Sequence, residues 1–243
     1  MKHNKIISLL IMVVASSLVF ISCKREAHLT ATIEKGIETK ATVQVYNATV
    51  KSARNFLYVD GVKISGPTFA YGNVFPATAY AFKVDPGSRT FLIKDTLVST
   101  TQPPLTFTQT MDAGKSYTIF TYDTLNSIKQ ATVENNIEIP NDTTSRLRFA
   151  NFVYNVTPVA AVDVYSSAMG HSKIFSNVAT ASVTDFIPYP SGVRDTLSIY
   201  ATGTTSPLII RLISTSVTPT RSYTTIYSGS YGGTKSFVLF NTY

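Results

Sequence analysis

Lys115-Ser-Tyr-Thr-Ile119 recurs in this sequence as Arg221-Ser-Tyr-Thr-Thr225, which places Tyr117 and Tyr223 106 positions apart. Two further anchors lie earlier in each half, in the same order and at an offset of 105. They are Phe56-Leu-Tyr-Val-Asp60 with Ala161-Val-Asp-Val-Tyr165, and Phe82-Lys-Val-Asp-Pro-Gly87 with Ile187-Pro-Tyr-Pro-Ser-Gly192. Three ordered anchors at nearly one offset indicate an internal repeat. The sequence therefore predicts two similar domains in tandem.

The residues around these anchors alternate between apolar and polar. Val43 and Val45 alternate with Thr42 and Gln44. In the same way Tyr80, Phe82 and Val84 alternate with Ala79, Ala81 and Lys83, and Tyr117 and Ile119 alternate with Thr118. Such alternation places one face of a strand in a core and the other in water, as in antiparallel sheets. Turn chemistry such as Asp-Gly and Asp-Pro-Gly separates the runs. No amphipathic helix is evident, so the fold class is all-β.

Each half supplies about seven short strands, which favours a β-sandwich of immunoglobulin-like architecture. Because the chain has one cysteine, no disulfide staples the sheets as in an antibody domain. We expect the following organisation: signal peptide 1–22, lipidated N-terminus and flexible tether 23–40, first β-sandwich 41–135, polar linker 136–144, and second β-sandwich 145–243.

The N-terminus has the pattern of an export signal. Lys2 and Lys5 precede a 15-residue apolar run, Ile6–Phe20, which is shorter than the roughly 20 residues of a membrane-spanning helix. The run ends in Leu18-Val-Phe-Ile-Ser-Cys23, which resembles the lipobox of bacterial lipoproteins. This resemblance implies cleavage before Cys23 and lipidation of its thiol, so the membrane is one expected partner. The alternative is a plain signal peptide with an incidental cysteine.

Charge gives further information about location and partners. Lys24-Arg25-Glu26 follows the cysteine and resembles, with one acid in place of two, the signal that sends Bacteroidota lipoproteins to the cell surface. We therefore expect an outer-membrane lipoprotein, with the membrane face undecided. Removal of Lys2 and Lys5 leaves 19 basic and 14 acidic residues, and the basic ones are scattered singly. This scatter argues against nucleic-acid binding.

The opening of the second half carries a family resemblance. Arg146-Leu-Arg-Phe-Ala-Asn-Phe152, a loop with Pro158, and Ala161-Val-Asp-Val-Tyr165 resemble a domain of unknown function that occurs in tandem in Bacteroidota lipoproteins. The first half keeps Val43-Gln-Val-Tyr-Asn47 but lacks the loop proline. The resemblance extends over nearly the whole chain after Cys23. It implies a fold and an envelope location, and no chemistry.

Catalytic and metal-binding patterns are weak. His3 lies in the signal peptide and His28 in the tether, which leaves His171, in a polar turn, as the one candidate base. With no folded cysteine, the usual ligands of a zinc site are missing. We therefore expect no catalytic residue, no metal and no cofactor. A remote alternative, a glycoside-active enzyme, requires two carboxylates within about 10 Å in a cleft.

Aromatic residues suggest a second function class, binding of envelope glycans. Tyr223, Tyr227 and Tyr231 recur in the last quarter and Tyr243 ends the chain, while tryptophan is absent. A glycan-binding accessory protein of an outer-membrane uptake system would present a row of exposed tyrosines on one face. The competing interpretation is that these tyrosines flank strands.

A modification motif recurs four times. Asp-Thr followed by Leu or Thr resembles the acceptor for O-glycosylation in Bacteroidota, and the candidate acceptors are Thr96, Thr124, Thr143 and Thr196. Together these patterns predict a non-enzymatic envelope lipoprotein that acts as a binding, adhesive or structural module, with an envelope glycan or another envelope protein as its partner.

Overall fold

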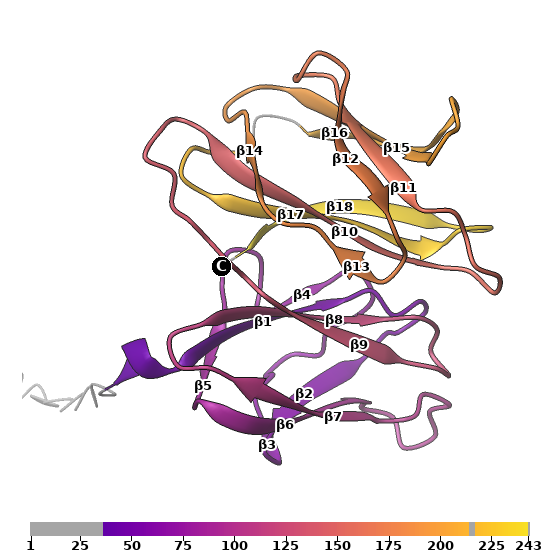
Figure 1. The fold of residues 1–243 in the computed structure, drawn as a ribbon. Helices are drawn as coiled ribbons and strands as arrows, with labels where there is room; N and C mark the ends of the chain where they lie inside the picture. The colour runs from indigo at the N-terminus through magenta and orange to yellow at the C-terminus, as the bar shows by residue number, and fades with distance from the viewer. Residues whose placement is uncertain (1–35, 214–216, 243) are drawn as a thin grey trace, which may run out of the picture. The chain divides into compact units, whose positions relative to one another are not determined.

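The computed structural model describes residues 36–213 and 217–242 (Figure 1). The predicted signal peptide, Cys23, all but the last residues of the tether, and Tyr243 lie outside this range. Gly36–Tyr243 forms one compact unit. It consists of strands and a short 3-10 helix, Ile37–Thr39, so the predicted all-β class is confirmed.

The first sandwich contains two sheets. One has the order β4-β1-β8-β9, with β5 also paired to β1, and the other has the order β3-β2-β6-β7. The strands are β1 Ala41–Asn47, β2 Asn55–Val59, β3 Val62–Lys63, β4 Val74–Phe75, β5 Phe82–Val84, β6 Gly87–Asp95, β7 Leu105–Met111, β8 Ser116–Tyr122 and β9 Lys129–Glu134.

The second sandwich has the same arrangement. One sheet has the order β13-β10-β17-β18, with β14 also paired to β10, and the other has the order β12-β11-β15-β16. The strands are β10 Ser145–Tyr154, β11 Val162–Ser166, β12 Ser172–Val178, β13 Ser182–Val183, β14 Ile187–Tyr189, β15 Asp195–Ala201, β16 Pro207–Ile213, β17 Ser222–Ser230 and β18 Lys235–Thr242.

The pairings around the first strand of each sandwich correspond. Val43 pairs with Phe82 on β5, and Leu147 pairs with Ile187 on β14. On the other side of β1 and β10, these two residues pair with Tyr117 and Tyr223. Thus the sequence anchors 117 and 223, and 82 and 187, occupy equivalent places in the two sheets.

One pairing in each sandwich is parallel. β1 runs parallel to β8 and β10 runs parallel to β17, whereas the other pairs of described strands are antiparallel. The two sheets that contain these parallel pairs, which we call the inner sheets, are therefore mixed. In each of them the first strand of the sandwich lies beside the penultimate strand, whereas in an immunoglobulin constant domain the first strand lies beside the second. The sequence pattern could not show this difference, because period-two alternation reports burial and not strand direction.

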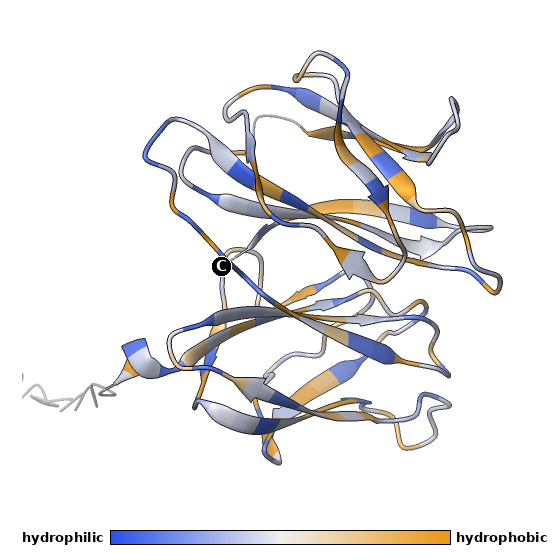
Figure 2. Ribbon diagram, viewed as in Figure 1, coloured by the Kyte–Doolittle hydropathy of each residue, from blue (hydrophilic) through white to orange (hydrophobic). Residues whose placement is uncertain are grey.

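Each sandwich encloses its own apolar core, and the strands carry the corresponding hydrophobic segments (Figure 2). In the first, Leu57, Phe91 and Ile119 are almost fully buried. Tyr117 and Tyr223 lie at equivalent corners, since the backbone N–H groups of Asp112 and Thr218 donate to their hydroxyls at 3.1 and 3.0 Å. This bond from a backbone N–H to the hydroxyl of a tyrosine five residues downstream resembles the tyrosine corner of Greek-key sandwiches.

A third apolar cluster joins the two sandwiches, and we call it the junction core. It is formed by side chains from β1, β8, β10, β17 and β18, together with Ala48: Tyr46, Ala48, Phe120, Ala150, Phe152, Ile226 and Phe240. The rings of Phe120 and Phe152 stack across it with centroids 4.8 Å apart. The sheet that contains β1 and β8 thus packs against the sheet that contains β10 and β17.

The junction core corrects part of the sequence interpretation. Thr42, Gln44 and Thr118 were expected in water, yet their exposed fractions are 5, 1 and 0%. They are covered because the second face of their sheet packs on the other sandwich. A further correction concerns Tyr80, expected to point inward on a strand. It is 66% exposed and precedes β5, because Ala79 adopts a left-handed turn conformation with φ 63°.

Candidate functional site

The sheet β12-β11-β15-β16 presents one face that no other described strand covers, and we call it the outer face of the second sandwich. Along β15 the side chains alternate: Leu197 and Ile199 are buried, whereas Thr196, Ser198 and Tyr200 are half-buried. This follows from the period of two in a strand. Thr196, Ser198 and Tyr200 therefore belong to the outer face.

Neighbouring strands add to this face. Ser198 pairs with Tyr165 on β11 and with Ile210 on β16, and Thr196 pairs with Leu212. Ile210 and Leu212 are 56 and 54% exposed, which is unusual for large aliphatic side chains at adjacent positions of one face. The outer face is thus a mixture of phenol rings, hydroxyls and aliphatic groups.

A hollow of about 520 Å³ lies on the outer face, and we call it the tyrosine hollow. It falls within the range of typical small-molecule sites. Besides Tyr165, Tyr200 and His171, five hydroxyl side chains line it: Ser167, Thr196, Ser198, Thr204 and Thr205. Within the described residues, the lining contains no carboxylate, ammonium or guanidinium group.

The two tyrosines are held in a defined geometry. The rings of Tyr165 and Tyr200 meet edge to face, with centroids 5.1 Å apart and planes at 74°. The ammonium group of Lys173 lies 5.7 Å from the centre of the Tyr165 ring and 2.7 Å from a carboxylate oxygen of Asp163. This ion pair is adjacent to the hollow and electrically neutral as a unit.

Asp163 fixes the position of Lys173. Its carboxylate is almost fully buried and accepts bonds from the backbone N–H of Asn177 at 2.7 Å and the Thr202 hydroxyl at 3.1 Å. Burial alone would raise the pKa of Asp163, but these bonds and Lys173 hold the pKa below its usual value. The carboxylate is therefore a structural anchor for the edge of the tyrosine hollow.

The first sandwich has a comparable hollow of about 450 Å³ on the face of its sheet β3-β2-β6-β7, but its chemistry differs. On that face Tyr58 pairs with Leu92, and Leu92 pairs with Thr106. The Lys94 ammonium lies 5.0 Å above the Tyr58 ring, and that of Lys63 lies 4.4 Å above Phe56. The aromatic faces there are occupied by the chain's own cations.

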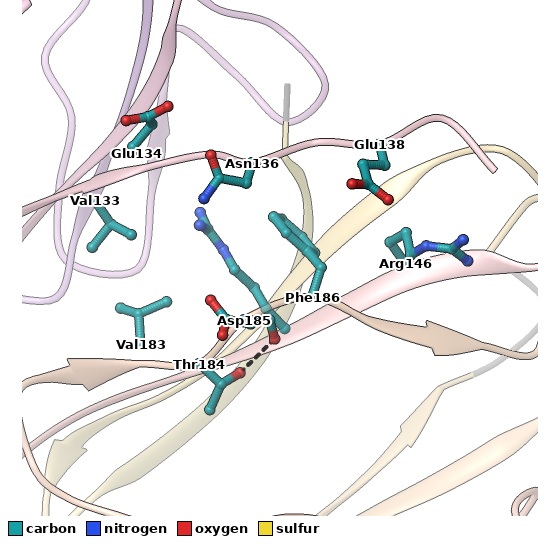
Figure 3. A pocket seen from close by; sticks show the side chains of 10 residues that line it. Val133, Glu134, Asn136, Glu138, Arg146, Val183, Thr184, Asp185 and Phe186 are labelled. Atoms are coloured by element: carbon teal, nitrogen blue, oxygen red, sulfur yellow. Dashed lines mark hydrogen bonds between the residues drawn. The ribbon is translucent and has the colours of Figure 1, made fainter.

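A second candidate site is a cleft of about 400 Å³ beside the linker (Figure 3). Glu134, Asn136 and Glu138 follow one another along one wall, and Asp185 and Phe186 lie across from them. Three carboxylates therefore share one cleft, which is the feature that the enzyme alternative requires.

The environment of these acids does not resemble a catalytic pair. Glu138 and Asp185 are solvent-exposed, and Glu134 is 2.8 Å from the Lys115 ammonium. A glycosidase acid needs a carboxyl that its surroundings keep protonated, usually by burial. None of the three described carboxyls has such an environment.

Arg148 also lines the cleft and is 1% exposed. Its guanidinium donates to the hydroxyl of Thr224 at 2.9 Å and to that of Thr118, from the other sandwich, at 3.0 Å. It also lies 4.7 Å from the centre of the Phe186 ring. Burial lowers the pKa of Arg148 to about 9, which leaves the group charged at neutral pH. Arg148 therefore joins the two sandwiches.

The four candidate acceptor threonines are in different environments. Thr96 and Thr143 are exposed, Thr124 is half-buried and bridged to Val50, and Thr196 lines the tyrosine hollow. The preceding aspartates have structural contacts. The carboxylate of Asp195, for instance, accepts bonds from Ser166, Ser167, Tyr189 and the backbone of Ala168.

The tyrosines named for the glycan-binding alternative do not form an exposed platform. Tyr223 and Tyr227 are 3 and 0% exposed and belong to the core of the second sandwich, because the second sheet covers their strand. Tyr231 is half-buried, with the Lys235 ammonium 5.8 Å from its ring centre. Tyr165 and Tyr200, both half-buried, form the aromatic pair on the outer face instead. The alternation in Asp195-Thr-Leu-Ser-Ile-Tyr-Ala201 was the signal that could have identified Tyr200.

His171 lies at the rim of the tyrosine hollow in a turn, with φ 56°. Among the residues that the structure describes, no group of three or more His, Cys, Asp or Glu side chains is placed to hold a metal ion. No helix within the described part of the chain is long and apolar enough to cross a membrane.

Comparison with known families gives one match. Residues 41–160, just under half of the chain, match the model of a domain of unknown function (DUF4397). The matched range covers β1 to β10, that is, the first sandwich and the first strand of the second. The match therefore covers less of the chain than the expected resemblance. It includes the first repeat, which was expected to fit less well.

Comparison with curated proteins finds no match. Among solved structures, a carbohydrate-binding module (family CBM26) from Eubacterium rectale, in complex with maltoheptaose, is 13% identical, with 82% of this chain and 96% of that chain covered and a TM-score of 0.27. A candidate cell adhesion protein from Bacteroides fragilis is 10% identical, with coverages of 85% and 98% and a TM-score of 0.21. Likeness at this level carries no argument about function.

Proposed function

We propose that this chain is a non-catalytic binding module of the bacterial cell envelope, held at the outer membrane by lipid on Cys23. The N-terminal pattern supports the anchor: two lysines, a 15-residue apolar run, and a small residue before the single cysteine. One acyl chain alone holds a protein weakly, whereas the several chains of a lipoprotein make the attachment stable.

The second sandwich, on this proposal, is a second copy of the domain whose model matches residues 41–160. The equal strand orders and the equivalent partners of Val43 and Leu147 support this. So do the corresponding corners at Tyr117 and Tyr223. When a domain is present in two copies, the surface of one copy can change while the other keeps its role. The outer faces of the two sandwiches do carry different side chains.

The observation that carries the binding function is the tyrosine hollow. An exposed concave site with two rings and five hydroxyls is not needed to hold the fold together, since the core residues Leu197 and Ile199 point to the opposite side of β15. Exposed Ile210 and Leu212 extend the same surface. Exposed apolar groups rimmed by polar ones typically mark interaction sites.

The junction core holds the two sandwiches together as one rigid body. Because β1 and β8 pack against β10 and β17 through buried aromatic rings, the two sandwiches move together. The tether between Cys23 and Gly36 then sets how far this unit stands from the membrane. A partner that contacts the outer face is thereby linked to the envelope through one stiff body.

Location is tested by protease treatment of intact cells followed by mass spectrometry. Release of peptides from residues 41–243 without lysis places the module on the cell surface, and protection until lysis places it in the periplasm. A Cys23→Ala variant is expected to leave the membrane fraction. Retention of that variant in membranes would contradict the lipid anchor.

Binding is tested with beads that carry the full-length protein in detergent. The beads are incubated separately with polysaccharide and protein fractions of cell envelopes. Saturable retention of material from either fraction is expected, with loss of retention when Ser198→Arg fills the tyrosine hollow. No saturable retention from either fraction would overturn the binding function.

A further inference from the structure

We propose that the tyrosine hollow is a binding site for a neutral sugar residue of a glycan. This inference rests on the proposed binding function and names the class of ligand. A sugar ring has C–H groups on its faces and hydroxyls around its edge, so it needs an apolar surface and several small hydrogen-bonding groups in one place. The hollow provides both within about 520 Å³.

The rings supply the apolar surface. Tyr165 and Tyr200 meet at 74°, so the two rings form adjoining walls and not one flat platform. Such walls fit a single sugar unit or a chain end better than a long flat chain. Each phenol hydroxyl can also donate or accept a hydrogen bond at the edge of the sugar.

The remaining lining supplies the hydrogen bonds. Hydroxyls of Ser198 and Thr196 come from β15, in the centre of the sheet, and others come from the loops at its ends. A hydroxyl both donates and accepts, as does each hydroxyl of a sugar, so either partner can adapt. His171 at the rim adds a ring nitrogen.

The charges of the side chains around the hollow argue against acidic glycans and phosphorylated ligands. The lining contains no cationic side chain among the described residues, and the nearby Lys173 is already paired with the buried Asp163 at 2.7 Å. An anionic ligand would have to leave water without gaining a counter-charge. A neutral ligand meets no such cost.

The first sandwich supplies the matched control. On the face of its sheet β3-β2-β6-β7, Tyr58 pairs with the aliphatic Leu92, whereas Tyr165 pairs with Ser198, and Lys94 lies over the Tyr58 ring at 5.0 Å. Cations lie over both aromatic rings of that hollow, Phe56 and Tyr58, whereas in the tyrosine hollow Lys173 lies over Tyr165 and not over Tyr200. We expect no neutral sugar to bind there.

The test uses an array of neutral oligosaccharides with their sialylated and sulfated counterparts, probed with the full-length lipidated protein in detergent. Binding to at least one neutral glycan is expected, with no gain from added negative charge. Ser198→Arg and Tyr200→Ala are expected to weaken binding at least tenfold. Tyr200→Phe, which keeps the ring and removes one hydroxyl, is expected to weaken binding less than Tyr200→Ala. The control Leu92→Arg is expected to stay within threefold of the wild type, and thermal unfolding checks that each variant is folded.

The outcomes separate this inference from the proposed function. An array without neutral binders, a preference for charged glycans, or unchanged binding by Ser198→Arg would overturn the sugar site. If the beads still retain envelope protein through the same face, the binding function stands while the sugar site fails. If the beads retain nothing, both fail.

Discussion

The rings of Phe120 and Phe152 lie 4.8 Å apart at an angle of 24°, and they come from different sandwiches. Tyr122 adds a second contact, with its ring centre 5.1 Å from that of Phe152. Because Phe120 and Phe152 are buried on the faces of two sheets, neither sandwich can present that face to water without exposing aromatic surface. The tandem is therefore expected to unfold as one cooperative unit.

We expect Phe152→Ala to cost about 3 to 5 kcal/mol of unfolding free energy, as for other large-to-small changes in a core. Chemical denaturation followed by fluorescence and circular dichroism measures this. The control is Val98→Ala, whose side chain is fully exposed and should change stability little. Two separate transitions in the wild-type protein would contradict cooperative unfolding.

Arg148 tests the polar part of the same junction. Arg148→Ala is expected to lose about 2 to 4 kcal/mol, because it removes both the packed stem and the bonds to two threonine hydroxyls. Arg148→Met keeps the stem and removes a charge from a dry site, so it should cost less than half as much. An equal loss in both variants would show that the charge, and not the packing, stabilises the junction.

Asp195 is expected to make stability depend on acid. Its burial alone would raise the pKa of its carboxyl, but bonds from Ser166, Tyr189, Ala168 and Ser167 outweigh burial and lower it from 3.8. A lowered pKa contributes stability above the unfolded value, and this is lost as the pH falls through the folded value. The unfolding free energy should therefore be flat from about pH 7 to 5 and should decline below about pH 4.

The matched variant is Asp195→Asn. At pH 7 it should be less stable by about 2 to 3 kcal/mol, since it weakens charge-assisted bonds in a buried site. Its decline below about pH 4 should be shallower than that of the wild type, with Asp163 accounting for part of the remaining slope. An identical slope in both proteins would exclude Asp195 as a source of acid sensitivity.

The two tyrosine corners should be energetically alike. Tyr117→Phe and Tyr223→Phe each remove a hydroxyl that accepts a backbone N–H bond, and each should cost about 1 kcal/mol. Thermal unfolding of both single variants provides the comparison. A large effect in one corner with none in the other would argue against equivalent domains.

The all-β fold was predictable because period-two alternation and the repeated Lys/Arg-Ser-Tyr-Thr motif are local features. The sequence did not allow us to predict which face of each inner sheet is exposed to water. Thr42 and Thr118 read as solvent-facing, since threonine is common on exposed strand faces, and burial by a second domain leaves no local signal. The parallel pairing of β1 with β8 was equally invisible, because it is set by the path of the intervening chain.

The candidate site was only partly predictable. Tyrosines were expected to matter, but sequence spacing selected Tyr223 and Tyr227, which are in the core. Tyr165 and Tyr200 meet through pairing of β11 with β15, a long-range relationship that one sequence does not reveal. Buried Arg148 gave no signal, since arginine on a strand normally reads as solvent-exposed.

Glycosylation stays a prediction for four threonines. Exposed Thr96 and Thr143 are accessible to a modifying enzyme, whereas half-buried Thr124 and Thr196 are less so. We therefore expect intact-mass analysis of the native protein to show glycan on Thr96 or Thr143 first. A mass equal to the lipidated polypeptide alone would contradict this.

The central claim is that the outer face of the second sandwich contacts the partner. Amide hydrogen exchange of the full-length protein, free and bound to the envelope fraction that the beads retain, tests this most directly. We predict slower exchange in the bound state over β15 (Asp195–Ala201) and β16 (Pro207–Ile213), with no change over β6 (Gly87–Asp95). Protection confined to β6 or to the linker cleft, with β15 and β16 unchanged, would contradict the account.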